Sequence, residues 1–137
     1  MPEVSTLRLH LLRAMYLVLI VGLAIFVWPS IVGPLPQTFG QNTVVMAMLG
    51  GISLLALLGL RYPLQMLPLL MFELLWKMVW ALGFALPAWL SGGLNEYAQI
   101  TLVECMVGLV LVPLALPWGY IVDKYIRAKP TPWLAAA

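Results

Sequence analysis

The chain has 137 residues, of which 64% are hydrophobic and only 9% are charged, and its formal net charge is +2. A soluble domain is about 45–50% apolar and about 25% charged, and so short a chain cannot hide this much apolar surface from water. The composition therefore excludes a water-soluble fold and predicts a single integral membrane domain over residues 1–137. The lone Cys105 and lone His10 exclude an internal disulfide, a cysteine metal cluster and a haem held by two histidines of one subunit.

Four apolar segments follow one another, each about as long as the roughly 20 residues that a spanning helix needs. The predicted spans are residues 11–32, 43–60, 64–90 and 97–118. Backbone groups find no hydrogen-bond partner in lipid, so these segments must be helices. Proline and glycine interrupt the chain between them, in the segments 33–36, 61–63 and 91–93. The sequence predicts an all-α membrane protein with four transmembrane helices in an antiparallel bundle.

Basic residues predict how this bundle is oriented. Four spans place six of the seven Lys and Arg residues on one side of the membrane: Arg8, Arg13, Arg61, Lys124, Arg127 and Lys129. Lys and Arg gather in cytoplasmic loops, so both termini are predicted to be cytoplasmic, with residues 119–137 as an interfacial tail. We assign a set of residues at this end to the lipid headgroup region: Arg61, Trp118, Tyr120, Lys124, Arg127 and Lys129.

Two further patterns have structural explanations. Aromatic residues near the span ends fit the belts that such residues form at membrane interfaces: Tyr16, Trp28, Tyr62, Trp89, Tyr97, Trp118 and Tyr120. In the second span Ala47 and Gly51 form a small-xxx-small pair, which suits either a dimer face or close packing within the same bundle. We favour packing within the bundle, because such pairs are frequent in membrane helices.

The third span carries two charges in its middle, Glu73 and Lys77. They are four residues apart with the acid first, a spacing that places both on one face of a helix and allows an ion pair. A helical wheel puts aromatic and apolar residues on the same face: Met66, Leu69, Leu70, Trp76, Trp80 and Phe84. Trp76 and Trp80 lie too deep for an interfacial belt. They suit core packing, a cation–π contact with Lys77, or stacking on a quinone-like ligand.

A third ionisable residue, Glu104, lies at similar depth in the fourth span, one turn from Gly108. Because the two spans are antiparallel, we expect Lys77 to lie between Glu73 and Glu104 in a buried polar site completed by Trp76 and Trp80. Three ionised groups would carry a net charge of −1 in a low dielectric, so one acid should hold a proton. Such a site suits structural cross-linking of helices, the favoured interpretation, or the binding of a proton or ligand.

Three motifs carry a resemblance: RYP at Arg61–Pro63, FE-LLWK-x2-W at Phe72–Trp80 and PW-x-Y at Pro117–Tyr120. Together with the residues around them, from Arg61 to Trp133, they resemble a group of short four-span bacterial inner-membrane proteins that has no assigned activity. The resemblance implies a multi-pass protein of the bacterial inner membrane. Four-span multidrug exporters are of similar size, but their essential acid lies in the first span, and the first span here has no charge between Ala14 and Val32.

The functional hypothesis is a structural or accessory subunit of a membrane complex, since the loops are short and no catalytic constellation is visible. One alternative is a small proton-linked transporter or channel that uses Glu73, Lys77 and Glu104. The other is a quinone- or lipid-binding membrane subunit with a pocket at Trp76 and Trp80. We expect no enzyme activity, catalytic residue, cofactor or metal site. The expected partners are the lipid bilayer and a larger complex or a homo-oligomer, and no nucleic acid.

Overall fold

The computed structural model describes residues 4–35 and 40–134, and this part of the chain is helical with no strand. Four helical stretches are long and apolar enough to cross a membrane: Thr6–Phe26, Gln41–Arg61, Leu67–Ser91 and Glu96–Ala115. Each overlaps one predicted span, and the ends differ by at most a few residues apart from those of the first span. There the helix begins at Thr6, because the Ser5 side chain accepts a hydrogen bond from the Arg8 amide at 3.1 Å and caps it. The structure thus confirms that the described residues form helices and no strands, with four helices of membrane-spanning character.

The elements in chain order include two π-helical segments, labelled η. They are α1 (Thr6–Phe26), α2 (Trp28–Val32), α3 (Gln41–Arg61), α4 (Leu67–Trp80), η1 (Ala81–Ala85), α5 (Leu86–Ser91), α6 (Glu96–Ala115), α7 (Trp118–Ile121) and η2 (Val122–Arg127). α4, η1 and α5 form one continuous rod. Asn95 caps α6 by accepting a hydrogen bond from the Ala98 amide at 2.8 Å.

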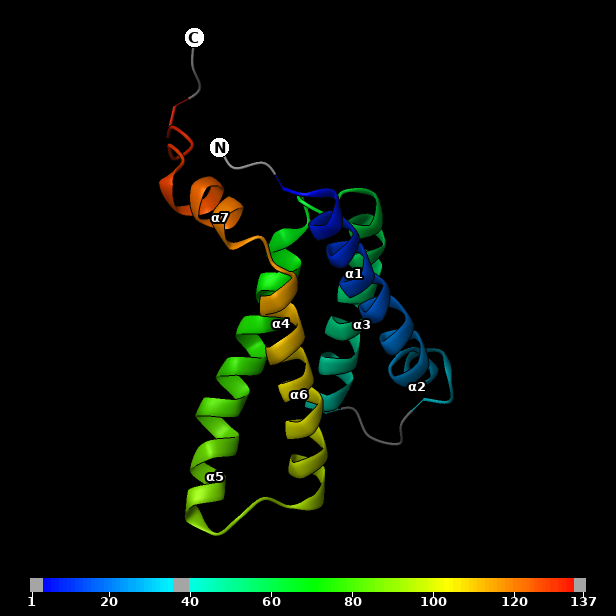
Figure 1. Cartoon of the computed structure of the whole chain (residues 1–137). Coiled ribbons are helices and arrows are strands. Elements are labelled where there is room, and N and C mark those ends of the chain that lie inside the picture. The colour runs from blue at the N-terminus through cyan, green and yellow to red at the C-terminus, as the bar shows by residue number, and fades with distance from the viewer. Residues whose placement is uncertain (1–3, 36–39, 135–137) are drawn as a thin grey trace.

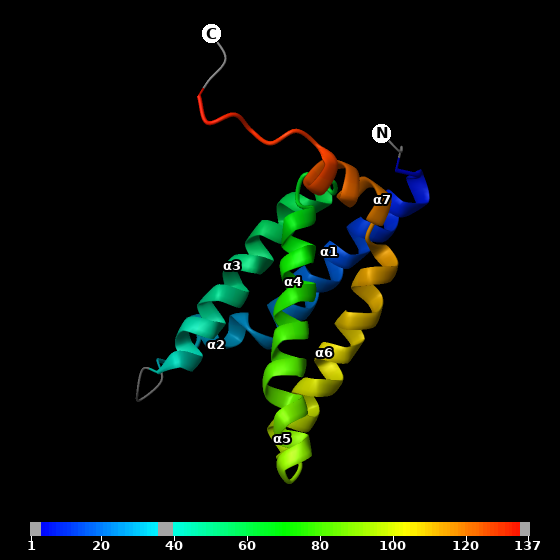
Figure 2. The same cartoon turned by 90° about the vertical axis from the view of Figure 1, so that its left-hand side faces the viewer.

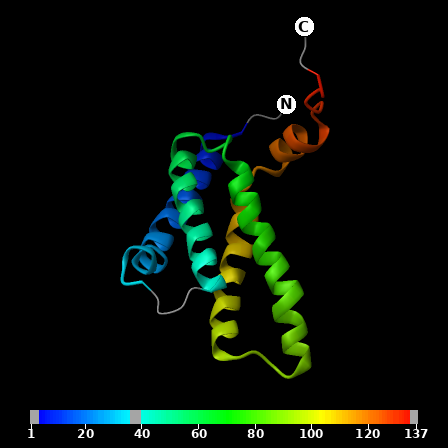
Figure 3. The ribbon, with the colours of Figure 1, turned by 180° about the vertical axis from the view of Figure 1, so that it is seen from behind.

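The long helices form two pairs that meet at one end of the molecule (Figure 1). α1 packs on α3, and α4 packs on α6. Contacts between the pairs are made by α1 with α6 and by α3 with α4. Figure 2 shows α3 and α4 close together near the turn that joins them and apart at their other ends, and the view from behind in Figure 3 agrees. The turn predicted around Arg61–Pro63 is therefore present, but the two helices it connects diverge.

The start of α1, the α3–α4 turn and the segment α7–η2 all lie at the end where the pairs meet (Figure 1). These elements carry Arg8, Arg13, Arg61, Lys124 and Arg127, and Lys129 follows η2, so we call it the basic end. Much of the buried apolar core lies in the same half, around Leu12, Leu67 and Leu116, which have no exposed surface. Towards the other end the pairs separate and expose their apolar side chains.

Tyr16 is the central side chain of the α1–α3 contact. It is fully buried, and its hydroxyl donates a hydrogen bond to the Pro63 carbonyl at 2.9 Å. Its ring lies against Gly59, where any Cβ atom would overlap it. The sequence predicts Tyr16 to be in an interfacial aromatic belt, but the residue lies in the core. Glycine at position 59 leaves room for its ring there.

Two arginines of α1 bind the carbonyl ends of neighbouring helices. Arg8 donates hydrogen bonds to the carbonyls of Leu114 and Leu116 at the end of α6. Arg13 donates through Nε to the carbonyl of Leu60 in the last turn of α3, at 3.0 Å. The last carbonyls of a helix lack partners within it and carry partial negative charge, so cations stabilise them. These bonds tie α1 to its partner α3 and to α6 of the other helix pair.

Prolines account for the irregular parts of the last two spans. Pro87 cannot donate a hydrogen bond to the carbonyl four residues earlier, and its ring would clash with that carbonyl in a regular helix. The wider π segment η1 ends at Ala85, two residues before Pro87, as expected where a membrane helix re-pairs its backbone. In α6 the helix continues through Pro113 and ends before Pro117. Pro117 leaves the Pro113 carbonyl without its regular donor, and the Trp118 indole N–H supplies one at 2.8 Å.

Candidate functional site

The pair predicted in the third span is present, with Glu73 buried and Lys77 partly buried. Lys77 Nζ lies 3.2 Å from Glu73 Oε2, within α4. The side chains are 15% and 3% exposed, respectively. Two opposite charges at this depth stabilise each other only when they are close, because leaving either alone in a low dielectric costs several kcal/mol. The helical i,i+4 spacing brings them together without help from another element.

Lys77 reaches across to α6, where its side chain lies directly over Gly108. A Cβ atom on residue 108 would stand 2.5 Å from Lys77 Nζ and 3.0 Å from Lys77 Cδ. Gly108 is buried, and it lies on the face of α6 that packs on α4, together with Cys105, Val112 and Ala115. The close approach of α4 to α6 at Gly108 is therefore made by the lysine side chain.

The two tryptophans assigned to this site, Trp76 and Trp80, are half-buried, and Trp76 contacts the pair. Lys77 Nζ lies 5.6 Å from the centre of the Trp76 ring, within the range of a cation–π contact. The Trp76 indole Nε1 is buried and has no acceptor in the part of the chain that the structure describes. A buried donor without a partner is costly, so an acceptor from outside the chain would be favoured there.

Glu104 lies outside the cluster in which the sequence placed it. Its side chain is exposed, and the described residues provide no cationic group within 4.0 Å of its carboxylate. The buried face of α6 includes Cys105 and Gly108. Glu104 is turned by about 100° from Cys105 but only about 40° from Gly108, so it lies at the edge of that face. Glu73 and Lys77 thus form an ion pair without Glu104, which is exposed at the edge of the packed face of α6.

Glu104 has apolar, exposed neighbours along the helix. Ile100 precedes Glu104 by four residues, Val107 follows it by three, and Leu111 follows Val107 by four. Each of these three side chains is at least 43% exposed. We call these three residues and Glu104 the Glu104 face. Glu104 is the ninth residue of the 20-residue helix α6, about 12 Å from its start, so its carboxylate is near the middle of the apolar stretch.

Phe84 also leaves the predicted stripe of the third span. It is 67% exposed, while Ala85 beside it is only 4% exposed. The π segment holds an additional residue in its turn, which moves the buried position one residue further along the chain. Leu69, Leu70 and Glu73, which precede that segment, are buried as the wheel predicts.

The residues assigned to the headgroup region lie at the basic end but have different surroundings. Arg127 pairs with Asp123 at 3.4 Å, and Lys124 donates a hydrogen bond to the Tyr120 hydroxyl at 3.1 Å. That hydrogen bond raises the pKa of Lys124 above its usual value. Arg61 is exposed, with its guanidinium 5.3 Å from the centre of the Tyr62 ring. Lys129 and Trp118 are also exposed.

Small residues of α3 do pack within the chain, but they are not the predicted pair. Ser53 is buried and accepts a hydrogen bond from the Trp28 indole at 2.8 Å, while a Cβ on Gly50 would meet the Ile31 side chain at 2.9 Å. Ala47 and Gly51 are exposed, and a Cβ on Gly51 would meet nothing within 4 Å. The packing explanation preferred for these two residues therefore does not hold within this chain.

Contacts that tie the helices together at the basic end were not found by sequence reasoning. The Arg8 and Arg13 bonds and the Tyr16–Gly59 contact depend on which helices are neighbours. The sequence features that could have pointed to these contacts are the basic residues at the start of the first span, Arg8 and Arg13, and the glycine near the end of the second, Gly59. Neither identifies its partner without the fold.

The described residues contain no group of three or more His, Cys, Asp and Glu side chains placed to hold a metal ion. Comparison of the chain with protein-family models, with curated proteins and with solved structures finds no match. The functional interpretation therefore rests on the geometry of the membrane-embedded charges and of the exposed helix faces.

Proposed function

We propose that this chain is an accessory subunit of a membrane complex and that it docks a partner through the Glu104 face of α6. The observation that carries the proposal is the exposed carboxylate in the middle of a spanning helix. An acid facing lipid at the centre of a bilayer costs about 2.5–3.5 kcal/mol on insertion scales. Docking against another protein removes that cost when the partner supplies a cation or a hydrogen-bond donor at the same depth.

The apolar neighbours of Glu104 complete such a surface. Ile100, Val107 and Leu111 offer a stripe of exposed aliphatic side chains around a single polar group. Helix association in membranes depends on side-chain packing and on hydrogen bonds between helices, and this face provides both. The partner is thus a spanning helix with a donor side chain, belonging to another protein or to a second copy of this chain.

The Glu73–Lys77 pair has a structural role in this proposal. It is closed, with Glu73 almost without exposed surface, and Lys77 fills the space over Gly108. A pair in this state fixes the register of α4 on α6, as buried polar groups do in some helical assemblies. The proton-linked transporter has less support, because a relay through all three ionisable groups would require Glu104 beside Lys77.

The proposal includes the topology. The four spans form an antiparallel bundle in the bacterial inner membrane, with the basic end and both termini in the cytoplasm. Six Lys and Arg residues at or near the span ends on one side support this orientation, since the loops at the other end contain none. The assignment to the inner membrane rests on the resemblance of Arg61–Trp133 to short bacterial four-span proteins.

The proposal is tested by affinity purification of the tagged full chain in mild detergent. Glu104→Leu should abolish the recovery of a stoichiometric partner, while Leu75→Ala, at an exposed position of α4, should leave it unchanged. Loss of the partner with both variants or with neither would contradict docking through the Glu104 face. A wild-type chain that is monomeric and partner-free in every preparation would overturn the proposal.

A second candidate function has one observation in its favour. The buried Trp76 indole N–H without an acceptor fits a lipid-soluble ligand with a carbonyl group, such as a quinone. Titration of the purified chain with a short-chain quinone should then quench tryptophan fluorescence saturably, and Trp76→Phe should abolish the saturable part. Quenching that is linear with quinone concentration, or equal in Trp89→Phe and Trp76→Phe, would contradict this binding site.

A further inference from the structure

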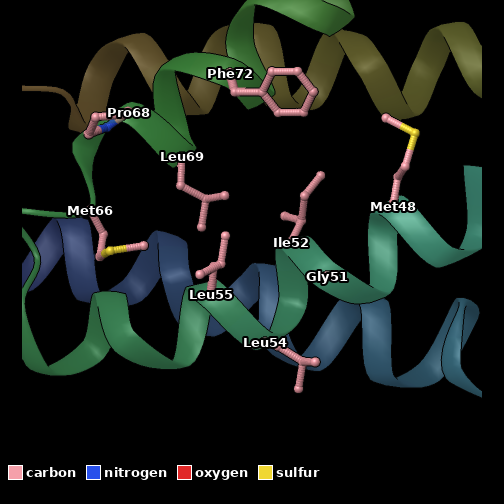
Figure 4. Close-up of a pocket in the computed structure, with 9 residues that line it drawn as sticks. All are labelled: Met48, Gly51, Ile52, Leu54, Leu55, Met66, Pro68, Leu69 and Phe72. Carbon is pink, nitrogen blue, oxygen red and sulfur yellow. The ribbon is translucent and has the colours of Figure 1, made fainter.

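A groove separates α3 and α4 where the two helix pairs diverge (Figure 4). Its volume is about 750 Å³, within the range of roughly 300–1,000 Å³ that small-molecule pockets have. Met48, Gly51 and Leu55 line it from α3, while Leu69 and Phe72 line it from α4, and Met66 lies in the turn between them. No lining side chain is polar.

One end of this groove is closed by the turn that joins its two walls. Arg61 and Tyr62 stand at this turn, and Arg61 holds its guanidinium 5.3 Å from the centre of the Tyr62 ring. Arg8 and Arg13 bind backbone carbonyls, and the described residues place no carboxylate within 4.0 Å of Arg61. Arg61 thus presents an exposed positive charge at the closed end.

The groove is thus apolar along its whole length, and the cationic Arg61 lies beyond its lining, in the last turn of α3 at the basic end. This order matches an amphiphile whose anionic head lies at the membrane surface and whose tails run inwards. Basic pockets between membrane helices bind anionic lipid headgroups by this arrangement. A partner helix would need an apolar wall but would have no use for the cation.

We propose that the groove is a binding site for an anionic phospholipid, with its phosphate at Arg61 and an acyl chain between α3 and α4. Met48 and Met66 at the edges of the groove are unbranched and flexible, so they adapt to a chain that has no fixed shape. Gly51 keeps the floor of the groove open, because a Cβ there would meet nothing within 4 Å. The site is independent of the Glu104 face, which lies on α6.

The headgroup part is tested by native mass spectrometry of the detergent-purified full chain. Phosphatidylglycerol and phosphatidylcholine with the same acyl chains are the two probes. The wild-type chain should bind phosphatidylglycerol about fivefold more tightly, the effect of roughly 1 kcal/mol for one basic residue near a lipid surface. Arg61→Gln should remove this preference, and Lys129→Gln, which removes a cation from the tail at the same end, should keep it.

The acyl-chain part is tested with a variant that fills the groove. Gly51→Leu should lower the retention of both lipids by at least fivefold, while Gly83→Leu, at another exposed glycine with no atom within 4 Å of its Cβ, should not. Equal affinity of the wild-type chain for both lipids would overturn the proposal. An equal loss of the preference for phosphatidylglycerol in Arg61→Gln and Lys129→Gln would also overturn it, because it would indicate a general attraction of anionic lipid. Unchanged retention of both lipids in Gly51→Leu would overturn it as well.

Discussion

The ammonium group of Lys77 lies where a side chain on Gly108 would begin, 2.5 Å from the position of a Cβ atom. The same ammonium group is 3.2 Å from Glu73 Oε2. The glycine on α6 thus leaves the space that the ion pair on α4 uses. The contact between the two helices and the neutralisation of the buried charge depend on the same atoms. A change at Gly108 should therefore weaken the ion pair, and a change in the ion pair should alter the helix contact.

Substitution of Gly108 should show this dependence. Gly108→Ala is expected to destabilise the chain by about 1–3 kcal/mol, because the new methyl group displaces Lys77 from its place beside Glu73. In the Glu73→Gln/Lys77→Ala background the space is empty, so the same change should cost less than about 0.5 kcal/mol. Reversible unfolding in detergent micelles measures both values. Equal costs in the two backgrounds would show that Lys77 does not occupy the space over Gly108.

The buried pair should behave as a coupled unit. Glu73→Gln or Lys77→Met alone should cost about 3 kcal/mol, since each leaves an unpaired buried charge. The double variant should lie closer to the wild type than either single variant. The Asp123–Arg127 pair is a matched control with the same spacing but an Arg127 side chain that is 74% exposed, so its coupling energy should stay below about 1 kcal/mol. A coupling at Glu73–Lys77 no larger than this control would contradict a structural role for the pair.

The Tyr16–Gly59 contact should be among the least tolerant sites in the chain. Gly59→Ala places a methyl group into the fully buried Tyr16 ring, and it should lower the free energy of unfolding by about 1–3 kcal/mol or prevent folding. Gly51→Ala adds the same atom in open space and should be neutral. The thermal stability of the two variants in the same detergent makes the comparison. Similar midpoints for both would show that the α1–α3 packing is not as described.

Trp118 should stabilise the chain through a hydrogen bond at the break between α6 and α7. Trp118→Phe removes the indole donor to the Pro113 carbonyl, which Pro117 cannot replace, and should cost about 1 kcal/mol. Trp89→Phe makes the same chemical change at a residue that is 62% exposed and should cost less. Unfolding free energies of the two variants measure the difference, and a larger loss for Trp89→Phe would contradict the assignment.

The positions of the spanning helices could be predicted because length and hydropathy decide them in a bilayer. The Glu73–Lys77 pair could be predicted as well, because both partners belong to one helix and its geometry is known in advance. Which face of α6 turns inwards could not, since that helix is apolar on every side and carries little information about direction. Glu104 was placed inwards together with Gly108. Gly108 is buried, but the packed face is centred nearer Cys105 and Val112, which leaves Glu104 exposed at its edge.

Other differences have equally local causes. Phe84 is exposed because the π segment before Pro87 adds a residue to one turn, which a regular helical wheel does not include. Tyr16 lies in the core because Gly59 of another helix makes room for it, and a pairing of α1 with α3 cannot be inferred from either helix alone. The divergence of α3 from α4, which creates the groove, likewise depends on each helix having a different main partner.

Site-specific photo-crosslinking in intact cells tests the docking of a partner on the Glu104 face most directly. A photoreactive amino acid replaces Val107 on that face, or Leu75 on the outer side of α4 as a control at similar exposure. We predict a discrete protein adduct from position 107, lost when Glu104→Leu is added, and only lipid adducts from position 75. Lipid adducts alone from position 107, or a protein adduct unaffected by Glu104→Leu, would contradict the proposal that this face is covered by a partner.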